Sequence, residues 1–173
     1  SDALFPVLSD ATQFFRRELE SCVEAREYLE RRGVDRAASE RFQLGWAPAN
    51  GNKLMQSLGT TADRKKALEM AGLIGSGSTG DYAKFRERVM FPILDKRGRT
   101  IAFGGRIIGA GEPKYLNSPE TVLFKKSQEL YGLYFARQFK HTRLVVVEGY
   151  MDVLSLAQFG VTEAVATLGT ATS

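Results

Sequence analysis

The feature that most constrains the fold is a continuous apolar run that ends in a carboxylate. Residues 144–147 are Leu-Val-Val-Val, and Glu148 follows them directly. Such a run is typical of a strand that is buried on both faces. Residues 150–159 have the apolar spacing of a helix that ends at Gly160, and residues 164–166 indicate a second buried strand. We therefore predict a β-α-β unit with parallel strands.

Glu148 lies where a ligand would be expected in such a unit. In open α/β sheets the ligand crevice lies at the carboxyl ends of the strands. A carboxylate there can hold a divalent metal, but it can also be an acid that is stabilised by the N-terminus of the following helix. Asp152 lies one helical turn further on and has the same two interpretations. Position alone leaves both open for both residues.

Composition limits the class of protein. With 173 residues, the chain can form one domain, or one domain and part of another. Cys22 and His141 are the only cysteine and the only histidine, so the chain can form neither an internal disulfide nor a Cys/His zinc site. No apolar run approaches the roughly 18 residues of a membrane span. We expect a cytoplasmic protein without a membrane segment.

The basic residues are concentrated in one stretch. The net charge is +4, yet residues 84–126 contain ten Lys/Arg and only four Asp/Glu. Such an excess favours a surface that faces a polyanion. A solvated charged face is the alternative, and charge alone does not decide between them.

The first 75 residues have the pattern of short helices. Asp10 and Ser21 each fit a capping pattern at a helix start, and Asp35 can cap a further helix that runs through residue 42. Two more helices are predicted near residues 52–58 and 61–71, because each is followed by a glycine.

The middle of the chain has strand and loop signals. We expect residues 44–48 to be a loop with a Trp anchor, and the glycine-rich residues 75–80 to be a flexible loop that lacks the Walker A pattern. Residues 89–94 and 100–103 predict a β-hairpin with a basic turn. Pro92 indicates an edge strand or a bulge.

Several residues of the basic stretch suit nucleic-acid contact. Arg106 follows two glycines, which allow close approach of a backbone or a phosphate. Lys114, Tyr115 and Asn117 are predicted to share one loop, and these side chains suit phosphate contact, base stacking and base-edge bonding respectively. A turn with a packed Tyr explains the loop equally well. Lys126 and its neighbour Lys125 add two cations, for which a solvated pair is the alternative.

Six motifs in order resemble the catalytic core of the bacterial replicative DNA primases, the DnaG-type enzymes. The similarity covers nearly the whole chain, and residues 25–29 and 32–33 belong to it as well. No single motif is decisive, but their order is very specific. The motifs are residues 85–93, 103–106, 114–121, 130–133, 147–152 and 166–170.

The resemblance implies an α/β fold with two parts. A mixed α+β N-terminal subdomain would span residues 1–140, and residues 141–173 would begin a Toprim domain, which is Rossmann-like. The family copies a single-stranded DNA template into a short RNA primer from ribonucleoside triphosphates. By resemblance, Glu148 is a catalytic acid at a Mg²⁺ or Mn²⁺ site, and Asp152 is the last acid of the same motif.

The resemblance also assigns residues to template and nucleotide. The family's basic residues match Arg32, Arg106, Lys114 and Lys126, and Tyr115 and Asn117 are carried over because they accompany Lys114. The family's full-length enzymes also have an N-terminal zinc module, a C-terminal domain that binds the replicative helicase, and an Asp-x-Asp metal motif on a later strand. None of these is found in residues 1–173.

We therefore expect a fragment that binds single-stranded DNA weakly and in a salt-sensitive way, and that does not synthesise primers. Glu148 alone would hold Mg²⁺ loosely. Two other readings stay open: a non-catalytic nucleic-acid-binding module, and part of another Toprim enzyme, a nuclease or a topoisomerase. The stretch 114–121 favours a primase. If the β-α-β unit is incomplete, residues 164–166 would instead form an exposed edge strand.

Overall fold

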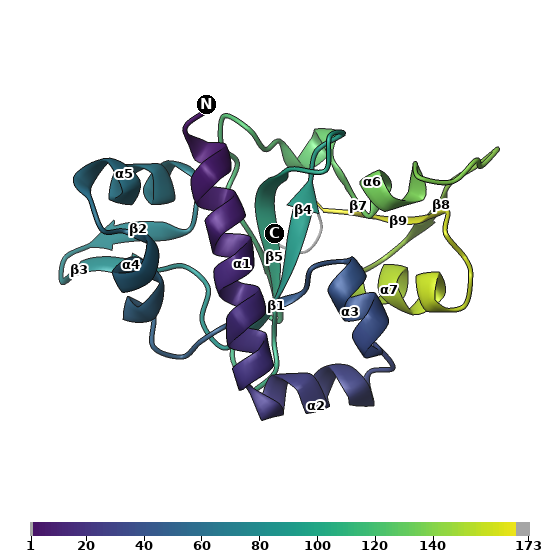
Figure 1. Cartoon of the computed structure of the whole chain (residues 1–173), viewed down its shortest axis with the longest axis horizontal. Coiled ribbons are helices and arrows are strands. Elements are labelled where there is room, and N and C mark those ends of the chain that lie inside the picture. The colour runs from purple at the N-terminus through teal and green to yellow at the C-terminus, as the bar shows by residue number, and fades with distance from the viewer. Residues whose placement is uncertain (1, 169–173) are drawn as a thin grey trace.

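The computed structural model describes residues 2–168 and has the mixed α/β class that the sequence predicts. Helices pack around three small β-sheets (Figure 1). Of the motifs that carry the resemblance, the end of the last one, Gly169 and Thr170, and the turn expected there lie outside the described residues. Within them, no helix combines the length and the apolar character needed to cross a bilayer.

The central sheet is antiparallel and four-stranded, in the order β1-β4-β5-β6. The predicted hairpin is confirmed as β4 and β5, with an irregular register beside Leu94. Strand β1 pairs only with residues 88–90, so β4 has a free edge at Pro92, as expected. The strands are β1 (Gly45–Ala47), β4 (Arg88–Leu94), β5 (Thr100–Ile107) and β6 (Tyr115–Asn117).

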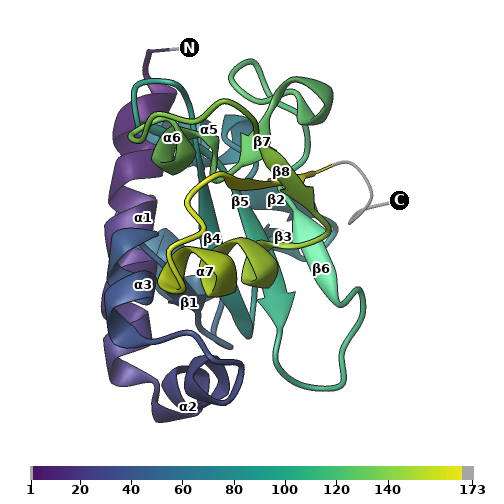
Figure 2. The ribbon, with the colours of Figure 1, turned by 90° about the vertical axis from the view of Figure 1, so that its right-hand side faces the viewer.

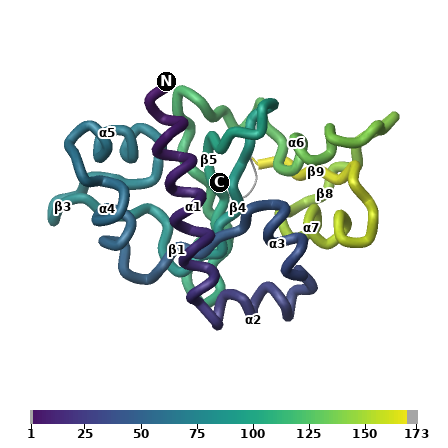
Figure 3. Tube along the Cα trace, in the orientation of Figure 1, coloured from purple at the N-terminus to yellow at the C-terminus, as the bar shows by residue number. Residues whose placement is uncertain are grey.

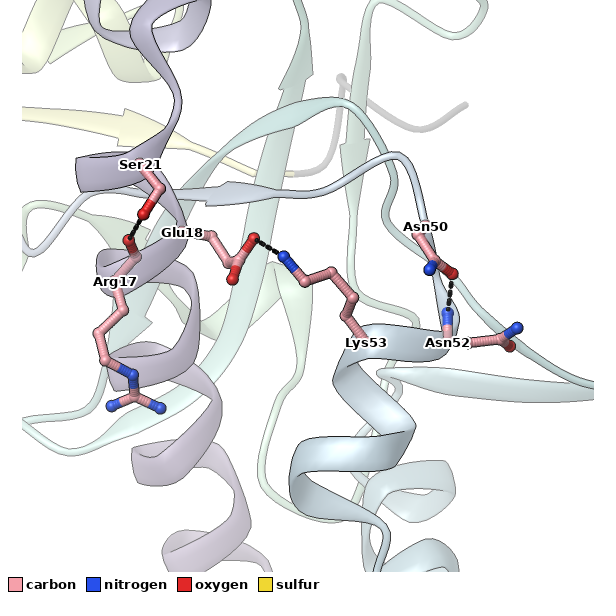
Figure 4. Close-up of polar contacts among 6 residues, drawn as sticks. All are labelled: Arg17, Glu18, Ser21, Asn50, Asn52 and Lys53. Carbon is pink, nitrogen blue, oxygen red and sulfur yellow. Dashed lines mark hydrogen bonds and ion pairs between the residues drawn. The ribbon is translucent and has the colours of Figure 1, made fainter.

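Helix α1 (Leu4–Ser21) crosses one face of this sheet (Figure 1). The approach is close: a Cβ at Gly45 would lie 2.4 Å from the Cβ of Phe15, so only glycine fits there. Phe15 also meets Phe103 of β5 edge to face at 5.2 Å. Helices α4 (Asn52–Leu58) and α5 (Ala62–Met70) complete this layer, and Lys53 ties α4 to Glu18 of α1 by an ion pair of 2.9 Å (Figure 4).

The opposite face of the sheet carries a second hydrophobic core. Val89, Phe91 and Ile93 of β4 point into it, whereas Met90 points to the α1 side. Three helices and a second sheet cover this face (Figure 2). They are α2 (Val23–Arg31), α3 (Arg36–Arg41), α7 (Tyr150–Gln158) and the strands β7 (Leu130–Tyr131), β8 (Val145–Val147) and β9 (Ala164–Thr167).

The predicted β-α-β unit is confirmed, because β8 and β9 are parallel and α7 lies between them in the chain. The burial of the two strands differs. The order β7-β9-β8 makes β9 the central strand, which is buried, and leaves β8 at an edge, where Val146 is 59% exposed. The predicted burial of residues 164–166 is therefore confirmed, whereas the predicted burial of 144–147 on both faces and the alternative of an exposed edge at 164–166 were wrong.

Two of the three predicted caps were wrong. Asp10 lies inside α1 and pairs with Arg64 at 2.6 Å, and the hydroxyl of Ser21 donates to the carbonyl of Arg17 (Figure 4). Neither side chain caps a helix start, because Asp10 contacts α5 and Ser21 bonds within α1. Asp35 does cap α3, since its carboxylate accepts from the N–H of Ala38 at 2.8 Å.

Three segments that were expected to be loops are strands. Residues 44–48 contain β1, and residues 75–80 lie in a hairpin of β2 (Ile74–Gly77) and β3 (Gly80–Ala83), visible at the far side of α4 in Figure 3. Lys114 directly precedes β6, and Tyr115 and Asn117 lie within it. In each case pairing with a neighbouring strand overrides the local turn signal. The helices expected near 52–58 and 61–71 are confirmed as α4 and α5.

Candidate nucleic-acid interface and metal carboxylates

Strands β5 and β6 place four site positions on one face. Arg106 lies directly opposite Tyr115, and Gly104 lies directly opposite Asn117. Side chains of residues that face each other across an antiparallel pair project to the same side. Strand pairing, not the predicted loop, therefore brings Arg106, Tyr115 and Asn117 together.

Arg106 is clamped between two tyrosine rings. Its guanidinium carbon lies 5.3 Å from the ring centroid of Tyr115 and 5.7 Å from that of Tyr28, on α2. Arg106 is 8% exposed, and its guanidinium also donates to the carbonyl of Ile107. Arg32 lies over the same Tyr28 ring at 5.3 Å. Two cations predicted from widely separated motifs thus share one aromatic residue, which contributes favourable cation–π contacts to both.

Arg88 is a member of this cluster that the sequence reasoning missed. It is 4% exposed and donates to the carbonyls of Gly105 and Lys114, each at 3.3 Å. Burial lowers the pKa of its guanidinium, and the neighbouring charge of Arg106 lowers it further. Among the described residues, neither Arg88, Arg106 nor Arg32 forms an ion pair with a carboxylate. A concentration of uncompensated positive charge in a low-dielectric wall attracts anions.

Tyr28 adds a polar group that has no partner. Its hydroxyl is buried and makes no hydrogen bond among the described residues. Tyr115 is half-buried, and this burial raises the pKa of its phenol although Arg106 acts in the opposite direction. The Tyr115 ring therefore remains neutral at physiological pH, as its cation–π contact with Arg106 requires. We name this set, Arg32, Arg88, Arg106, Tyr28 and Tyr115, the arginine cluster.

The two lysines of the predicted site lie on different segments. Lys114 is exposed, and its carbonyl accepts from the N–H of Ile107 at 3.0 Å, which extends the β5–β6 pairing. Lys126 is half-buried in the short 3-10 helix η1 (Lys126–Gln128), where its N–H donates to the carboxylate of Glu120 at 2.8 Å.

Asn117 is buried and engaged at both ends of its amide. It is 3% exposed, its Nδ2 donates to the carbonyl of Leu168 at 2.7 Å, and its Oδ1 accepts from the hydroxyl of Tyr150. Tyr150 is the first residue of α7, and its ring stacks on Phe91 with centroids 4.8 Å apart and planes 14° apart. Asn117 thus ties the central sheet to α7 and to the end of β9.

Glu148 and Asp152 lie on either side of Tyr150. Both carboxylates are exposed, Glu148 after β8 and Asp152 in the first turn of α7. Asp152 turns back along its helix, since its Oδ2 would lie 3.8 Å from a Cβ at Gly149. Oxygen ligands of this kind suit a hard divalent cation, but residues 2–168 contain no group of three or more acidic, His or Cys side chains that could surround one. The pair fits part of a metal site.

Tyr150 fixes the carboxylates relative to the arginine cluster. Its ring centroid lies 6.1 Å from that of Tyr115, and its hydroxyl is bonded to Asn117. Burial raises the pKa of the Tyr150 phenol far above its usual value, so it stays a donor. The sequence offered one signal for Tyr150 and Arg88: both lie inside the motifs that carry the family resemblance.

Comparison with known proteins identifies the family. Residues 14–137 match the family described as the DNA primase catalytic core, N-terminal domain, and residues 145–173 match the Toprim-like family. The chain belongs to the DNA primase family. It is 46% identical over 175 residues to the DNA primase of Escherichia coli strain K12, and the matched region covers 98% of this chain and 30% of that protein. The Toprim-like match implies a divalent-metal site.

Solved primase structures share the fold. The DnaG primase catalytic domain bound to single-stranded DNA has a TM-score of 0.93 and 45% identity, over 99% of this chain and 55% of that chain. The RNA polymerase domain of Mycobacterium tuberculosis DnaG, in complex with a double-stranded DNA oligomer that has a 6-nucleotide overhang, has a TM-score of 0.91 and 37% identity, over 100% of this chain and 56% of that chain. The present chain thus spans about half of these catalytic domains.

Proposed function

We propose that this chain is the template-binding part of a bacterial DNA primase core, which synthesises short RNA primers on single-stranded DNA from ribonucleoside triphosphates. The observation that supports this most is the joint placement of an arginine cluster without carboxylate partners and two exposed carboxylates, linked through Tyr150 and Asn117. Primer extension needs both kinds of group: cations for phosphates, and carboxylates for a metal ion.

In this proposal, Arg106 and Arg32 face phosphates of the template or the nucleotide, and Lys114 and Lys126 extend that surface. Tyr115 supplies a ring edge for a base, and Asn117 acts by holding Tyr150. Glu148, with Asp152, holds Mg²⁺ or Mn²⁺. When bound, such an ion neutralises charge on the reacting phosphate and lowers the pKa of the attacking hydroxyl.

The binding proposal is tested by fluorescence anisotropy with a labelled single-stranded oligonucleotide. Combined Arg106→Ala and Lys114→Ala should weaken binding about tenfold at low salt, because each lost phosphate contact reduces the counterion release that drives binding. The matched control Arg17→Ala with Lys66→Ala removes the same charge from exposed positions on α1 and α5. Equal losses in both variants, or an affinity independent of salt, would contradict the proposal.

The catalytic proposal is tested separately. We expect residues 1–173 alone to make no dinucleotide from template and nucleotides, because residues 2–168 contain no group of three or more side chains that could surround a metal ion, and Glu148 with Asp152 would hold Mg²⁺ loosely. Mn²⁺ binding, followed by electron paramagnetic resonance, should be weak in the chain and weaker still after Glu148→Gln. Robust template-dependent synthesis by this chain would overturn the inactivity that we propose.

We also propose a boundary between two subdomains near residue 140. The subdomains are residues 1–140 and 141–173, and trypsin should cut between them, since Arg137, Lys140 and Arg143 are exposed there. Recruitment by the replicative helicase would occur through another part of the primase, in the bacterial cytoplasm.

A non-catalytic binding module is the second candidate function. The small number of metal ligands in residues 2–168 favours it. Mn²⁺ binding that is insensitive to Glu148→Gln would support it.

A further inference from the structure

A second cationic surface lies away from the arginine cluster. Helix α6 (Leu133–Ala136) and the segment 137–144 project from the end of the molecule that is remote from α2 (Figures 1 and 2). In Figure 2, α6 and β6 also lie at opposite corners. We call the side chains of Arg41, Arg137, Phe139, Lys140 and Arg143 the basic tip.

The charges of the basic tip have no counterpart among the described residues. Its four cations are exposed, and none of them forms an ion pair within residues 2–168. Residues 130–147 contain no Asp or Glu. Glu40 precedes Arg41 in the chain, but its carboxylate pairs with Arg36. The segment therefore keeps a strong positive charge.

The basic tip also has an aromatic component, which an ordinary solvated charge patch lacks. The guanidinium carbon of Arg41 lies 5.4 Å from the ring centroid of Phe139, and also near the rings of Phe42 and Phe135, at 5.7 and 5.9 Å. Phe139 is nevertheless 45% exposed. His141 lies beside it in a tilted arrangement, with ring centroids 6.0 Å apart, and is fixed by a hydrogen bond of 3.0 Å to Thr162.

We propose that the basic tip is a second binding site for single-stranded nucleic acid, in which a base stacks on Phe139 and phosphates contact Arg137, Lys140 and Arg143. An aromatic face next to several cations is the combination that binds single strands without sequence preference. Arg41 holds the Phe139 ring from behind, which lowers the entropy lost on stacking. An acidic peptide would use the cations but leave the exposed ring without a role.

The site can be observed directly because Trp46, the only tryptophan, is 7% exposed. A Phe139→Trp variant places a reporter on the surface, and binding of a twelve-nucleotide oligo-dT should quench its emission. In this background, Arg137→Ala with Lys140→Ala should lower the affinity measured by quenching about tenfold. The slope of log affinity against log salt should also fall by about 1.4, because each of the two lost phosphate contacts contributes roughly 0.7. The control Arg17→Ala with Lys66→Ala should leave both unchanged.

The site stands independently of the proposed template surface. Adding Arg106→Ala and Lys114→Ala to Phe139→Trp should leave quenching at the tip within about twofold, whereas anisotropy at the template surface falls. In the chain without the tryptophan reporter, Phe139→Ala should weaken oligonucleotide binding at the basic tip about fivefold or more, because one base can no longer stack. Absent quenching, equal loss in the control pair, or quenching by polyglutamate as strong as by oligo-dT would each overturn the proposal.

Discussion

Strands β4 and β8 both lead to candidate site residues, but they differ sharply in burial. All residues of β4 except Leu94 are buried, because α1 covers one face of the central sheet and α7 with the second sheet covers the other. In β8 no residue is fully buried, and Val146 is 59% exposed. The arginine cluster therefore rests on a rigid sheet, whereas Glu148 follows a thinly supported edge strand.

The difference indicates what positions the carboxylates. Helix α7 is anchored by Tyr150, Val153 and Leu154, which are buried in the same core as Phe91. Its first turn carries Asp152 and is separated from Glu148 only by Gly149. The carboxylates are thus held by the packing of α7 against the central sheet, and β8 contributes little. Changes at the sheet–α7 contact should have large effects, and changes in β8 small ones.

The largest effect is expected from Gly104→Ala. A Cβ at this position would lie 2.3 Å from the ring and hydroxyl of Tyr150, and the stacked Phe91 blocks the ring from moving away. Overpacking of this kind should lower the free energy of unfolding by about 3 kcal/mol. Urea denaturation measures it. Gly109→Ala is the matched control, since a Cβ there meets nothing within 4 Å, and a comparable loss in that variant would rule out the explanation.

A smaller loss, about 2 kcal/mol, is expected from Asn117→Ala. The change leaves the buried Tyr150 hydroxyl and the Leu168 carbonyl without their partner. A double-mutant cycle with Tyr150→Phe, again by urea denaturation, should give a coupling energy of about 1 kcal/mol. Strict additivity of the two changes would show that the sheet–α7 tie does not depend on this bond.

Tyr131→Phe should instead raise the free energy of unfolding, by about 1 kcal/mol at pH 8. Tyr131 joins β7 to the central sheet, is 1% exposed, and its hydroxyl has no hydrogen-bond partner among the described residues. Removing an unsatisfied buried hydroxyl is favourable. Tyr150→Phe, which breaks a bond to Asn117, should instead destabilise.

The same tyrosine gives a pH dependence whose sign is defined. Burial raises the pKa of Tyr131 well above its usual value of 10.0, so above pH 10 the unfolded chain loses this proton and the folded chain retains it. Stability should therefore fall as the pH rises above 10, with no effect below it. Tyr131→Phe should reduce the fall between pH 8 and pH 11, measured by urea midpoints; an unchanged slope would contradict this.

Sequence patterns predicted the elements whose signal is local. The helix at 150–158, the β4–β5 hairpin and the cap at Asp35 each depend on spacing within a few residues. Strand β1 could not be found in this way, because three residues pair with a strand some forty positions later. The exposure of β8 was missed because strand order, which decides burial, is not a local property.

The candidate site shows the same division. Residue types and motifs identified Arg106, Tyr115 and Glu148, but not what holds them in place. Tyr28, from α2, contacts Arg106 only through the tertiary fold, and the burial of Asn117 follows from the docking of α7. Chemistry-bearing side chains can be read from sequence more readily than the side chains that position them.

The smallest effect is expected in β8, and it tests the contrast in burial between β4 and β8 most directly. Val146 and Val165 lie opposite each other in neighbouring parallel strands, yet they are 59% and 0% exposed. Val146→Thr should change the free energy of unfolding by less than about 0.5 kcal/mol, because its side chain is largely in water. Val165→Thr makes the same chemical change inside the core and should cost about 1 to 3 kcal/mol, since the hydroxyl is buried.

Hydrogen exchange at the Val146 amide should likewise be much faster than at Phe91 of β4. Equal costs for the two valines would mean that β8 is covered in solution, and that the carboxylates rest on a firmer strand than its exposure indicates.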